Sequence, residues 1–205
     1  MRALLLSMGL GALPGFVTAG RPPGAGVRVA FVPTAGDPYD DPSWVAADRR
    51  TLQGYGWDVT DLDVARAGPR EVDEALDGAD LVYVAGGNTF HLLHHVRRSG
   101  LDAALARHTG LLYAGASAGA VLAGPDIAPV AAMDDPSAAP DLASTRGLGL
   151  VDVVVVPHVG GQLLPQEAWD AIRAEHGDRF ELVPLRDDEA LLVEDGTLTR
   201  VPSPH

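Results

Sequence analysis

Apolar and polar positions along this chain alternate between two kinds of segment. Short runs rich in valine and leucine, apolar on both faces, are typical of parallel strands that helices cover on either side. Such runs predict strands at residues 3–8, 27–32, 57–62, 81–84, 111–114 and 151–156. Between them, apolar residues at helical spacing predict helices at residues 42–53, 69–76, 89–97, 101–107, 117–123 and 166–175. This alternation indicates an α/β fold, a three-layer α/β/α sandwich around a mostly parallel sheet.

The pattern changes toward the C-terminus. Residues 181–184, 190–193 and 197–201 predict short antiparallel strands, with a hairpin turn at 194–196. Residues 202–205 are expected to form a frayed tail. The stretch 125–145 has no clear period, and a loop of this length is typical of a lid or a pocket wall. No repeat or linker divides the chain, so we expect residues 1–205 to form a single domain.

The amino-acid composition excludes several kinds of chemistry and of binding partner. The absence of cysteine excludes disulfides, thiolate metal sites and a cysteine nucleophile. All 15 basic residues are arginine, so no lysine is available for Schiff-base chemistry. A formal net charge of −13 argues against nucleic-acid or anionic-membrane partners. No apolar run approaches the roughly 20 residues that span a bilayer. We interpret residues 3–8 as a buried first strand rather than part of a signal peptide, and expect a cytoplasmic protein.

One serine has the sequence context of a nucleophile. The predicted strand 111–114 runs into Gly-Ala-Ser-Ala-Gly at 115–119, which places Ser117 in a G-x-S-x-G turn before a helix. Small neighbours permit a turn so tight that the Oγ of Ser117 is exposed on strained backbone. The following helix directs free N–H groups to the same point. The alternative is a small-residue junction that only permits close packing.

A serine nucleophile needs a base, and His158 is the candidate. His158 follows the apolar run 153–156, so it and Ser117 are both predicted at carboxyl ends of strands, where open α/β sheets bind ligands. The alternative is a histidine that caps a strand. The acid that would orient the imidazole is open between two clusters: Asp187, Asp188 and Glu189 before a late strand, and Asp134 and Asp135 in the long loop.

A second glycine motif follows the predicted strand 81–84. Gly86 and Gly87 let backbone N–H groups turn toward a ligand, and Asn88 or Thr89 is expected to cap the next helix. The N–H groups of Gly87 and Ala118 are the candidates for an oxyanion hole.

Three histidines follow on the same predicted helix. His91 and His95 are one turn apart, but a zinc-protease motif would need glutamate where Leu92 stands. We therefore expect no metal and no other cofactor. This helix face is expected at the pocket rim, with Asn88 and His91 as candidate substrate-binding residues.

Three motifs together resemble the peptidase E family of serine peptidases, which are aspartyl dipeptidases with a fold similar to class I glutamine amidotransferases. They are Ala-Gly-Gly-Asn-Thr-Phe at 85–90, Gly-Ala-Ser-Ala-Gly-Ala at 115–120 and Val-Pro-His at 156–158. The resemblance implies a Ser-His-acid hydrolase in which Ser117 is the nucleophile, His158 the base, and Gly87 with Ala118 the oxyanion hole. The family's acid is typically a glutamate before a late strand, and Asp187 occupies that position.

One family feature is missing. Members specific for N-terminal aspartate carry an arginine shortly after the histidine, whereas residues 160–166 here contain no basic residue. Strict recognition of a substrate carboxylate by an arginine is therefore not expected.

The leading hypothesis is a serine dipeptidase or aminopeptidase that hydrolyses dipeptides or short peptides at the N-terminal residue. A rival is a cyanophycinase-like hydrolase of β-aspartyl-arginine peptides, since an acidic pocket suits arginine. An α/β-hydrolase esterase would take its acid from Asp134, Asp135 or Asp152. A further alternative is a non-enzymatic, amidotransferase-like binding protein, in which the turn at Ser117 would be an inherited structural feature without catalytic function. The expected partner is a small peptide, with no nucleic acid or membrane, and the chain is expected to be a monomer or a homodimer.

Overall fold

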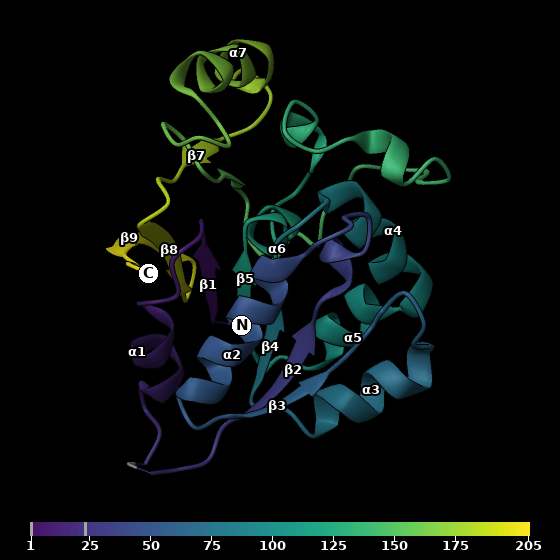
Figure 1. Ribbon diagram of the computed structural model, residues 1–205, viewed down its shortest axis with the longest axis vertical. Coiled ribbons are helices and arrows are strands. Elements are labelled where there is room, and N and C mark those ends of the chain that lie inside the picture. Colours follow the sequence, from purple (N-terminus) through teal and green to yellow (C-terminus); the bar gives the residue numbers. More distant parts are fainter. Residues whose placement is uncertain (1, 23) are drawn as a thin grey trace.

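The computed structural model describes residues 2–22 and 24–205. Its centre is a seven-stranded sheet of order β3-β2-β4-β5-β1-β8-β9 (Figure 1). The parallel strands are β3 (Asp58–Asp61), β2 (Arg28–Val32), β4 (Leu81–Val84), β5 (Leu112–Ala116) and β1 (Ala3–Leu6). β8 (Glu189–Glu194) and β9 (Thr197–Pro202) extend the sheet in antiparallel fashion. The predicted mostly parallel sheet with an antiparallel C-terminal region is confirmed.

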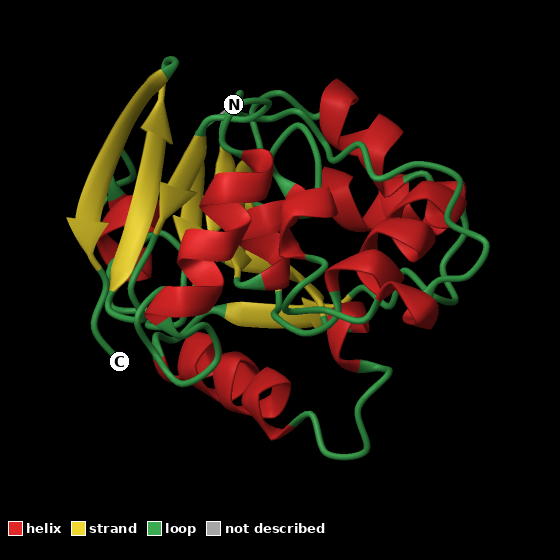
Figure 2. Ribbon diagram, turned by 90° about the horizontal axis from the view of Figure 1, so that it is seen from above, coloured by secondary structure: helices red, strands yellow, loops and turns green. Residues whose placement is uncertain are grey.

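Helices cover both faces of this sheet (Figure 2). One layer holds α1 (Leu13–Thr18) and α2 (Ser43–Gly54). The other holds α3 (Pro69–Asp77), α4 (Thr89–Ser99), α5 (Leu101–Arg107) and α6 (Ala118–Leu122). Neighbouring residues of one strand enter opposite layers, since Leu4 and Leu6 pack on the α1–α2 side and Leu5 packs on the other. Burial on both faces explains the continuous apolar runs of the sequence.

A second, two-stranded sheet consists of β6 (Val154–Val156) and β7 (Leu182–Pro184), covered by α7 (Gln166–His176). Figure 1 shows α7 and β7 beyond one end of the main sheet. β6 and β7 are parallel, so the predicted antiparallel arrangement of residues 181–184 is wrong. The reason is that α7 crosses over between the two strands, a connection that suits a parallel pair.

The C-terminal residues are docked, and the predicted frayed tail is wrong. Ser203 is fully buried, and its Oγ donates to the carbonyl of Gly9 (2.6 Å). The N–H of Gly11 donates to the carbonyl of Pro204 (2.8 Å).

Helix α1 is not predicted by the sequence pattern, because its sequence includes Pro14 and Gly15, which disfavour a helix interior. Pro14 lies in the first turn, where proline is tolerated.

The long stretch 125–145 contains two short 3₁₀ turns, η2 (Ala128–Val130) and η3 (Pro136–Ala138). It is tied to α4, because Asn88 Nδ2 donates to the carbonyl of Asp135 (3.0 Å).

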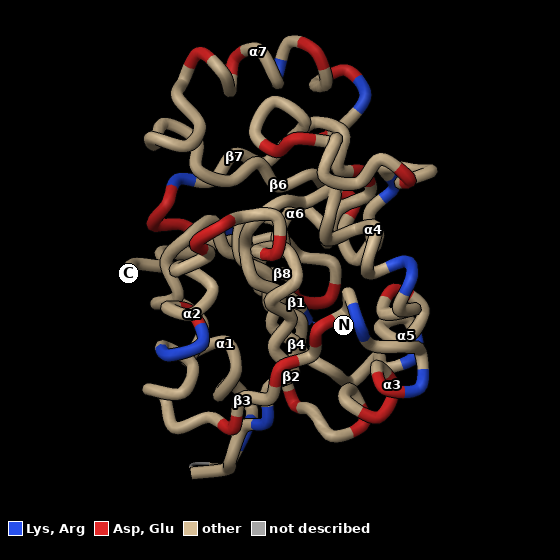
Figure 3. The backbone as a smooth tube through the Cα atoms, turned by 45° about the vertical axis from the view of Figure 1, so that its right-hand side comes forward, with Lys and Arg blue, Asp and Glu red and all other residues tan. Residues whose placement is uncertain are grey.

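Acidic residues are spread over much of the chain rather than gathered in one segment (Figure 3). Within the described residues, no helix combines the length and apolar character needed to cross a bilayer.

Candidate active site

Ser117 lies on the turn between β5 and α6, with φ 49° and ψ −109°. A side chain rarely tolerates this backbone geometry, so the predicted strained turn is confirmed. The flanking glycines are required by close contact, since a Cβ on Gly115 would overlap the carbonyl of Gly119, and one on Gly119 would overlap that of Val84. The N–H of Ser117 donates to the carbonyl of Leu6 in β1 (2.9 Å), which fixes the turn to the sheet.

His158 follows β6 and brings its ring to the serine. Ser117 Oγ and His158 Nε2 are 2.8 Å apart, and His158 Nδ1 is 2.7 Å from Asp187 Oδ1. An ionised carboxylate only accepts hydrogen bonds, so Nδ1 of the neutral ring donates and Nε2 is left to accept from the serine hydroxyl. The histidine side chain is only 4% exposed, which shields its bonds from bulk water.

The backbone of His158 is held by a residue that sequence reasoning did not assign to the site. His158 has a positive φ of 65°, and its N–H donates to Ser7 Oγ (2.8 Å). Ser7 is fully buried and follows β1, the strand beside β5. Its place at the carboxyl end of a central parallel strand is the signal that would have identified it.

Asp187 is the carboxylate that meets His158. It lies in the turn before β8 and is tied to the N-terminal segment, because the N–H of Gly9 donates to its carbonyl (3.0 Å). Gly161 leaves room for its side chain, since a Cβ there would stand 2.8 Å from Asp187 Oδ2. Aspartate therefore reaches the imidazole directly at the position where the resemblance leads one to expect glutamate.

The alternative acids bond to other groups. Thr89 donates to Asp134 (2.9 and 2.5 Å), Ser137 N–H to Asp135 (2.8 Å), and arginines pair with Asp188 (3.6 Å) and Glu189 (3.0 Å). The described contacts thus place Asp187, and none of these four, on His158. Asp187 also follows His158 in the chain, whereas an α/β-hydrolase esterase has the order serine, acid, histidine.

The second glycine motif runs directly beside the serine. A Cβ on Gly86 would stand 3.1 Å from Ser117 Cβ, and one on Gly87, at φ 145°, would overlap the carbonyl of Ala35. Ala118 opens α6 on the other side of the serine. An oxyanion hole formed by the N–H groups of Gly87 and Ala118 remains a prediction.

Asn88 and His91 have structural contacts. Of the two predicted caps of α4, Asn88 and Thr89, it is Asn88 that caps the helix, and its Oδ1 accepts from the N–H of His91 (2.9 Å). The His91 ring lies 4.4 Å from that of His95, with Nε2 3.7 Å from Asp37 Oδ2. Neither Asn88 nor His91 lines the cavity at Ser117, so substrate binding by them remains a prediction. In the described part of the chain, no three acidic or histidine side chains converge as a metal site requires.

The serine and histidine face a cavity of about 440 Å³, here called the Ser117 cavity. Tyr39, Trp44 and Leu163 line its mouth and are 41%, 37% and 63% exposed. The long loop contributes Met133 and Asp134, so it forms a pocket wall as predicted. Asp48 of α2 adds a second carboxylate. Sequence reasoning missed the α2 contribution because α2 connects β2 to β3, neither of which pairs with β5.

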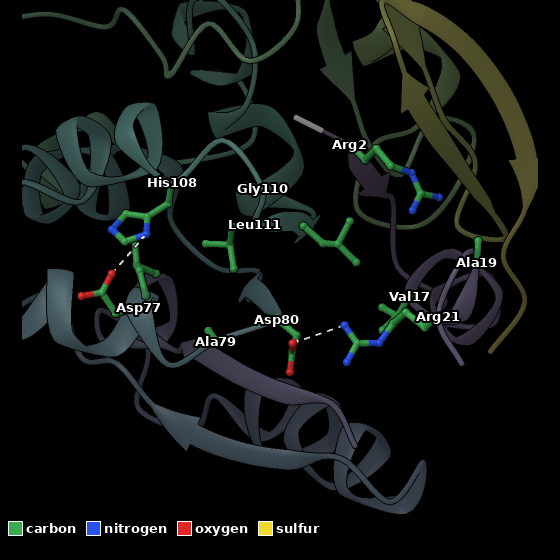
Figure 4. A pocket seen from close by; sticks show the side chains of 12 residues that line it. Arg2, Val17, Ala19, Arg21, Asp77, Ala79, Asp80, His108, Gly110 and Leu111 are labelled. Carbon is green, nitrogen blue, oxygen red and sulfur yellow. Dashed lines mark hydrogen bonds and ion pairs between the residues drawn. The ribbon is translucent and has the colours of Figure 1, made fainter. Parts of the chain in front are cut away.

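A second cavity, of about 390 Å³, lies at the opposite end of the strands (Figure 4). Its lining includes residues that precede β1, β4 and β5, such as Arg2 and Asp80. Its charges are paired within the protein, for example Arg21 with Asp80 (3.3 Å). None of its described lining residues also lines the Ser117 cavity.

The fold and this site define a class: an α/β protein with a serine on a strained strand–helix turn, bonded to a histidine that a carboxylate holds. Peptidase family S51 matches residues 20–201 of the chain. An uncharacterized peptidase of Listeria innocua is 35% identical over 173 residues, which cover 83% of this chain and 82% of that protein. Peptidase E of Streptomyces coelicolor is 38% identical over 136 residues, or 65% of this chain and 52% of that protein.

Two solved structures have a fold similar to that of this chain. A Listeria monocytogenes protein described as a candidate peptidase E shares 30% identity and a TM-score of 0.88, with 98% of both chains covered. A peptidase from an acI-B1 Actinobacterium, at 21% identity and a TM-score of 0.68, shares the fold over 98% of this chain and 87% of that one. The chain belongs to peptidase family S51, the peptidase E family. These comparisons support the assignment of this chain as a peptidase.

Proposed function

We propose that the chain is a serine peptidase with Ser117 as nucleophile, His158 as general base and Asp187 as the acid that orients the imidazole. The observation that carries the proposal is the continuous hydrogen-bonded chain from Ser117 Oγ to His158 Nε2 (2.8 Å) and from His158 Nδ1 to Asp187 (2.7 Å). The same three roles define serine hydrolases on unrelated folds.

The geometry supports a two-step reaction. Ser117 Oγ attacks the scissile carbonyl carbon while His158 Nε2 takes the hydroxyl proton. The N–H groups of Gly87 and Ala118 are the proposed donors to the oxyanion that forms. His158 then gives its proton to the departing amine as the C–N bond breaks and an ester to Ser117 remains. Water, deprotonated by His158, hydrolyses that ester and restores the serine.

Dipeptides or short peptides are the substrates that we propose. A cavity of about 440 Å³ lies in the range that encloses small ligands rather than folded chains. Among the described residues that line it, His158 is the only one with a basic side chain. This lining offers no arginine for a substrate carboxylate, so strict specificity for N-terminal aspartate is not part of the proposal.

A specific observation also favours a second candidate, a cyanophycinase-like hydrolase of β-aspartyl-arginine peptides. Two carboxylates, from Asp48 and Asp134, line the cavity that holds the serine, and such a lining suits a guanidinium group. The two candidates share the catalytic chemistry and differ in the peptide bond that is cleaved.

The test is hydrolysis of α-aspartyl, β-aspartyl and non-acidic dipeptides by the purified chain and by Ser117→Ala. We expect turnover of at least one substrate class and a loss of about 10³-fold or more in the variant. Ser43→Ala, an exposed serine at the start of α2, is the matched control. Wild-type turnover by Ser117→Ala would contradict the proposal. Binding of peptides without any hydrolysis would favour a non-enzymatic binding protein.

A further inference from the structure

The described lining of the Ser117 cavity has two acidic side chains and, apart from His158, no basic one. Asp48 and Asp134 line it, and Arg side chains are absent from its described lining. Burial raises the pKa of Asp134, and the hydrogen bonds from Thr89 oppose that rise. Two carboxylates beside a serine nucleophile repel an acidic substrate side chain and attract a cationic group.

Asp48 is held in place on one side only. Its Oδ2 accepts from the hydroxyl of Tyr83 (2.7 Å), and among the described residues no donor contacts Oδ1. Tyr83 is fully buried and stacks on Phe31 with ring centroids 5.5 Å apart, so this support is rigid. A half-buried carboxylate with one oxygen that no described protein donor bonds is a natural acceptor for a ligand N–H.

Trp44 adds an aromatic surface next to this carboxylate. Trp44 and Asp48 are four residues apart on α2 and therefore share one helix face. Trp44 Nε1 donates to the carbonyl of Gly86 (3.0 Å), the glycine that lies against Ser117. Tyr39 meets Trp44 edge-to-face, with ring centroids 5.1 Å apart. An aromatic face beside a carboxylate is the combination that recognises organic cations.

We propose that Asp48 and Trp44 form a subsite for a positively charged group of the peptide substrate, and that Asp48 is the specificity-determining residue. The inference rests on the proposed peptidase function and goes beyond it by naming the substrate class. The cation is either the α-ammonium group of the peptide or the side chain of an arginine or lysine, and both present N–H donors to Oδ1 of Asp48.

The experiment compares matched peptides. Dipeptides that contain arginine are paired with the same dipeptides that contain citrulline, which has nearly the same shape and no charge. Each is also prepared with a free and an N-acetylated amine. We expect Asp48→Asn, which keeps an oxygen for Tyr83, to lower the charged-over-neutral ratio of kcat/KM by about tenfold. A change in the arginine–citrulline ratio identifies the side chain, and one in the free–acetylated ratio identifies the α-ammonium.

Asp41→Asn is the matched control, because Asp41 is exposed and the same negative charge is removed close to α2. We expect both ratios to stay at the wild-type value in this variant. If Asp48→Asn leaves both ratios unchanged while the wild type hydrolyses peptides, the subsite is wrong and the peptidase proposal stands.

Binding supplies a readout independent of turnover. Isothermal titration of Ser117→Ala with the arginine and citrulline peptides, free and acetylated, measures preference for the cation directly. We expect tighter binding of at least one charged form and loss of that preference when Asp48→Asn is added. Equal affinity for charged and neutral forms would overturn the inference even if the chain hydrolyses no peptide.

Discussion

Ser117 Oγ and His158 Nε2 lie 2.8 Å apart although the two residues follow strands of different sheets. Ser117 follows β5 of the main sheet, and His158 follows β6 of the small one. Both have positive φ, 49° and 65°. Strained backbone on both sides of one hydrogen bond indicates that the surrounding structure holds these side chains in register at a cost in stability.

That cost predicts an effect of glycine at position 117. Glycine adopts a positive φ without the steric penalty of a Cβ. We expect Ser117→Gly to unfold with a free energy about 1 kcal/mol higher than Ser117→Ala, measured by urea denaturation. Both variants lack the hydroxyl, so the comparison isolates the backbone. Equal stability would show that the turn is not strained.

Asp187 provides a second prediction. Asp187→Asn replaces an acceptor with an amide that cannot stabilise the imidazolium formed during attack. We expect kcat to fall about 10³-fold with little change in KM. Asp188→Asn changes a neighbouring exposed carboxylate and should remain close to wild type. If the two substitutions have equal effects, Asp187 has no special role.

Ser7 is predicted to act as a positioning residue. Its Oγ accepts from the N–H of His158 (2.8 Å), so Ser7→Ala leaves a buried donor without this partner. We expect kcat to fall about tenfold with KM nearly unchanged, and the free energy of unfolding to fall by about 2 kcal/mol. A purely structural role predicts the stability loss with normal kcat. Ser43→Ala is the exposed control.

Much of this site follows from local sequence rules. The small residues around Ser117 predict a strained turn because only they permit the backbone contact of Gly115 with Gly119. His158 follows an apolar strand as predicted, although that strand, β6, is shorter than predicted and belongs to the small sheet rather than to the main one. Both inferences need only a strand end and its neighbours, which short stretches of sequence specify.

Other features depend on distant contacts. Asp48 and Trp44 reach the cavity from α2, and no local pattern specifies where a helix face points across a sheet. The choice of Asp187 among several acids depends on how the turn before β8 packs beside His158. The docked tail depends on Gly9, almost the full chain length away from Ser203 in sequence. Long-range packing decides each of these.

The raised pKa of Asp48 also predicts that the stability of the protein depends on pH. Burial raises the pKa of Asp48 from 3.8 to about 6, against a smaller opposing effect of the hydrogen bond from Tyr83. The folded state therefore favours the protonated acid, and this contribution to stability is complete below pH 3.8 and is lost as the pH rises through 6.

Asp48→Asn removes this dependence. We expect the variant to exceed the wild type in free energy of unfolding by on the order of 2 kcal/mol near pH 8, and the gain to vanish near pH 3. Urea denaturation at both pH values measures it, and Asp41→Asn is the exposed control. A gain of equal size at both pH values would contradict the assigned pKa.

The most direct test of the central claim is the intact mass of the chain after reaction with a fluorophosphonate, followed by peptide mapping. An activated serine displaces fluoride and keeps the phosphonyl group. The account predicts one adduct, on Ser117, which is absent from Ser117→Ala and forms much more slowly in Asp187→Asn. No adduct on Ser117, or labelling that Ser117→Ala retains in full, would contradict the account.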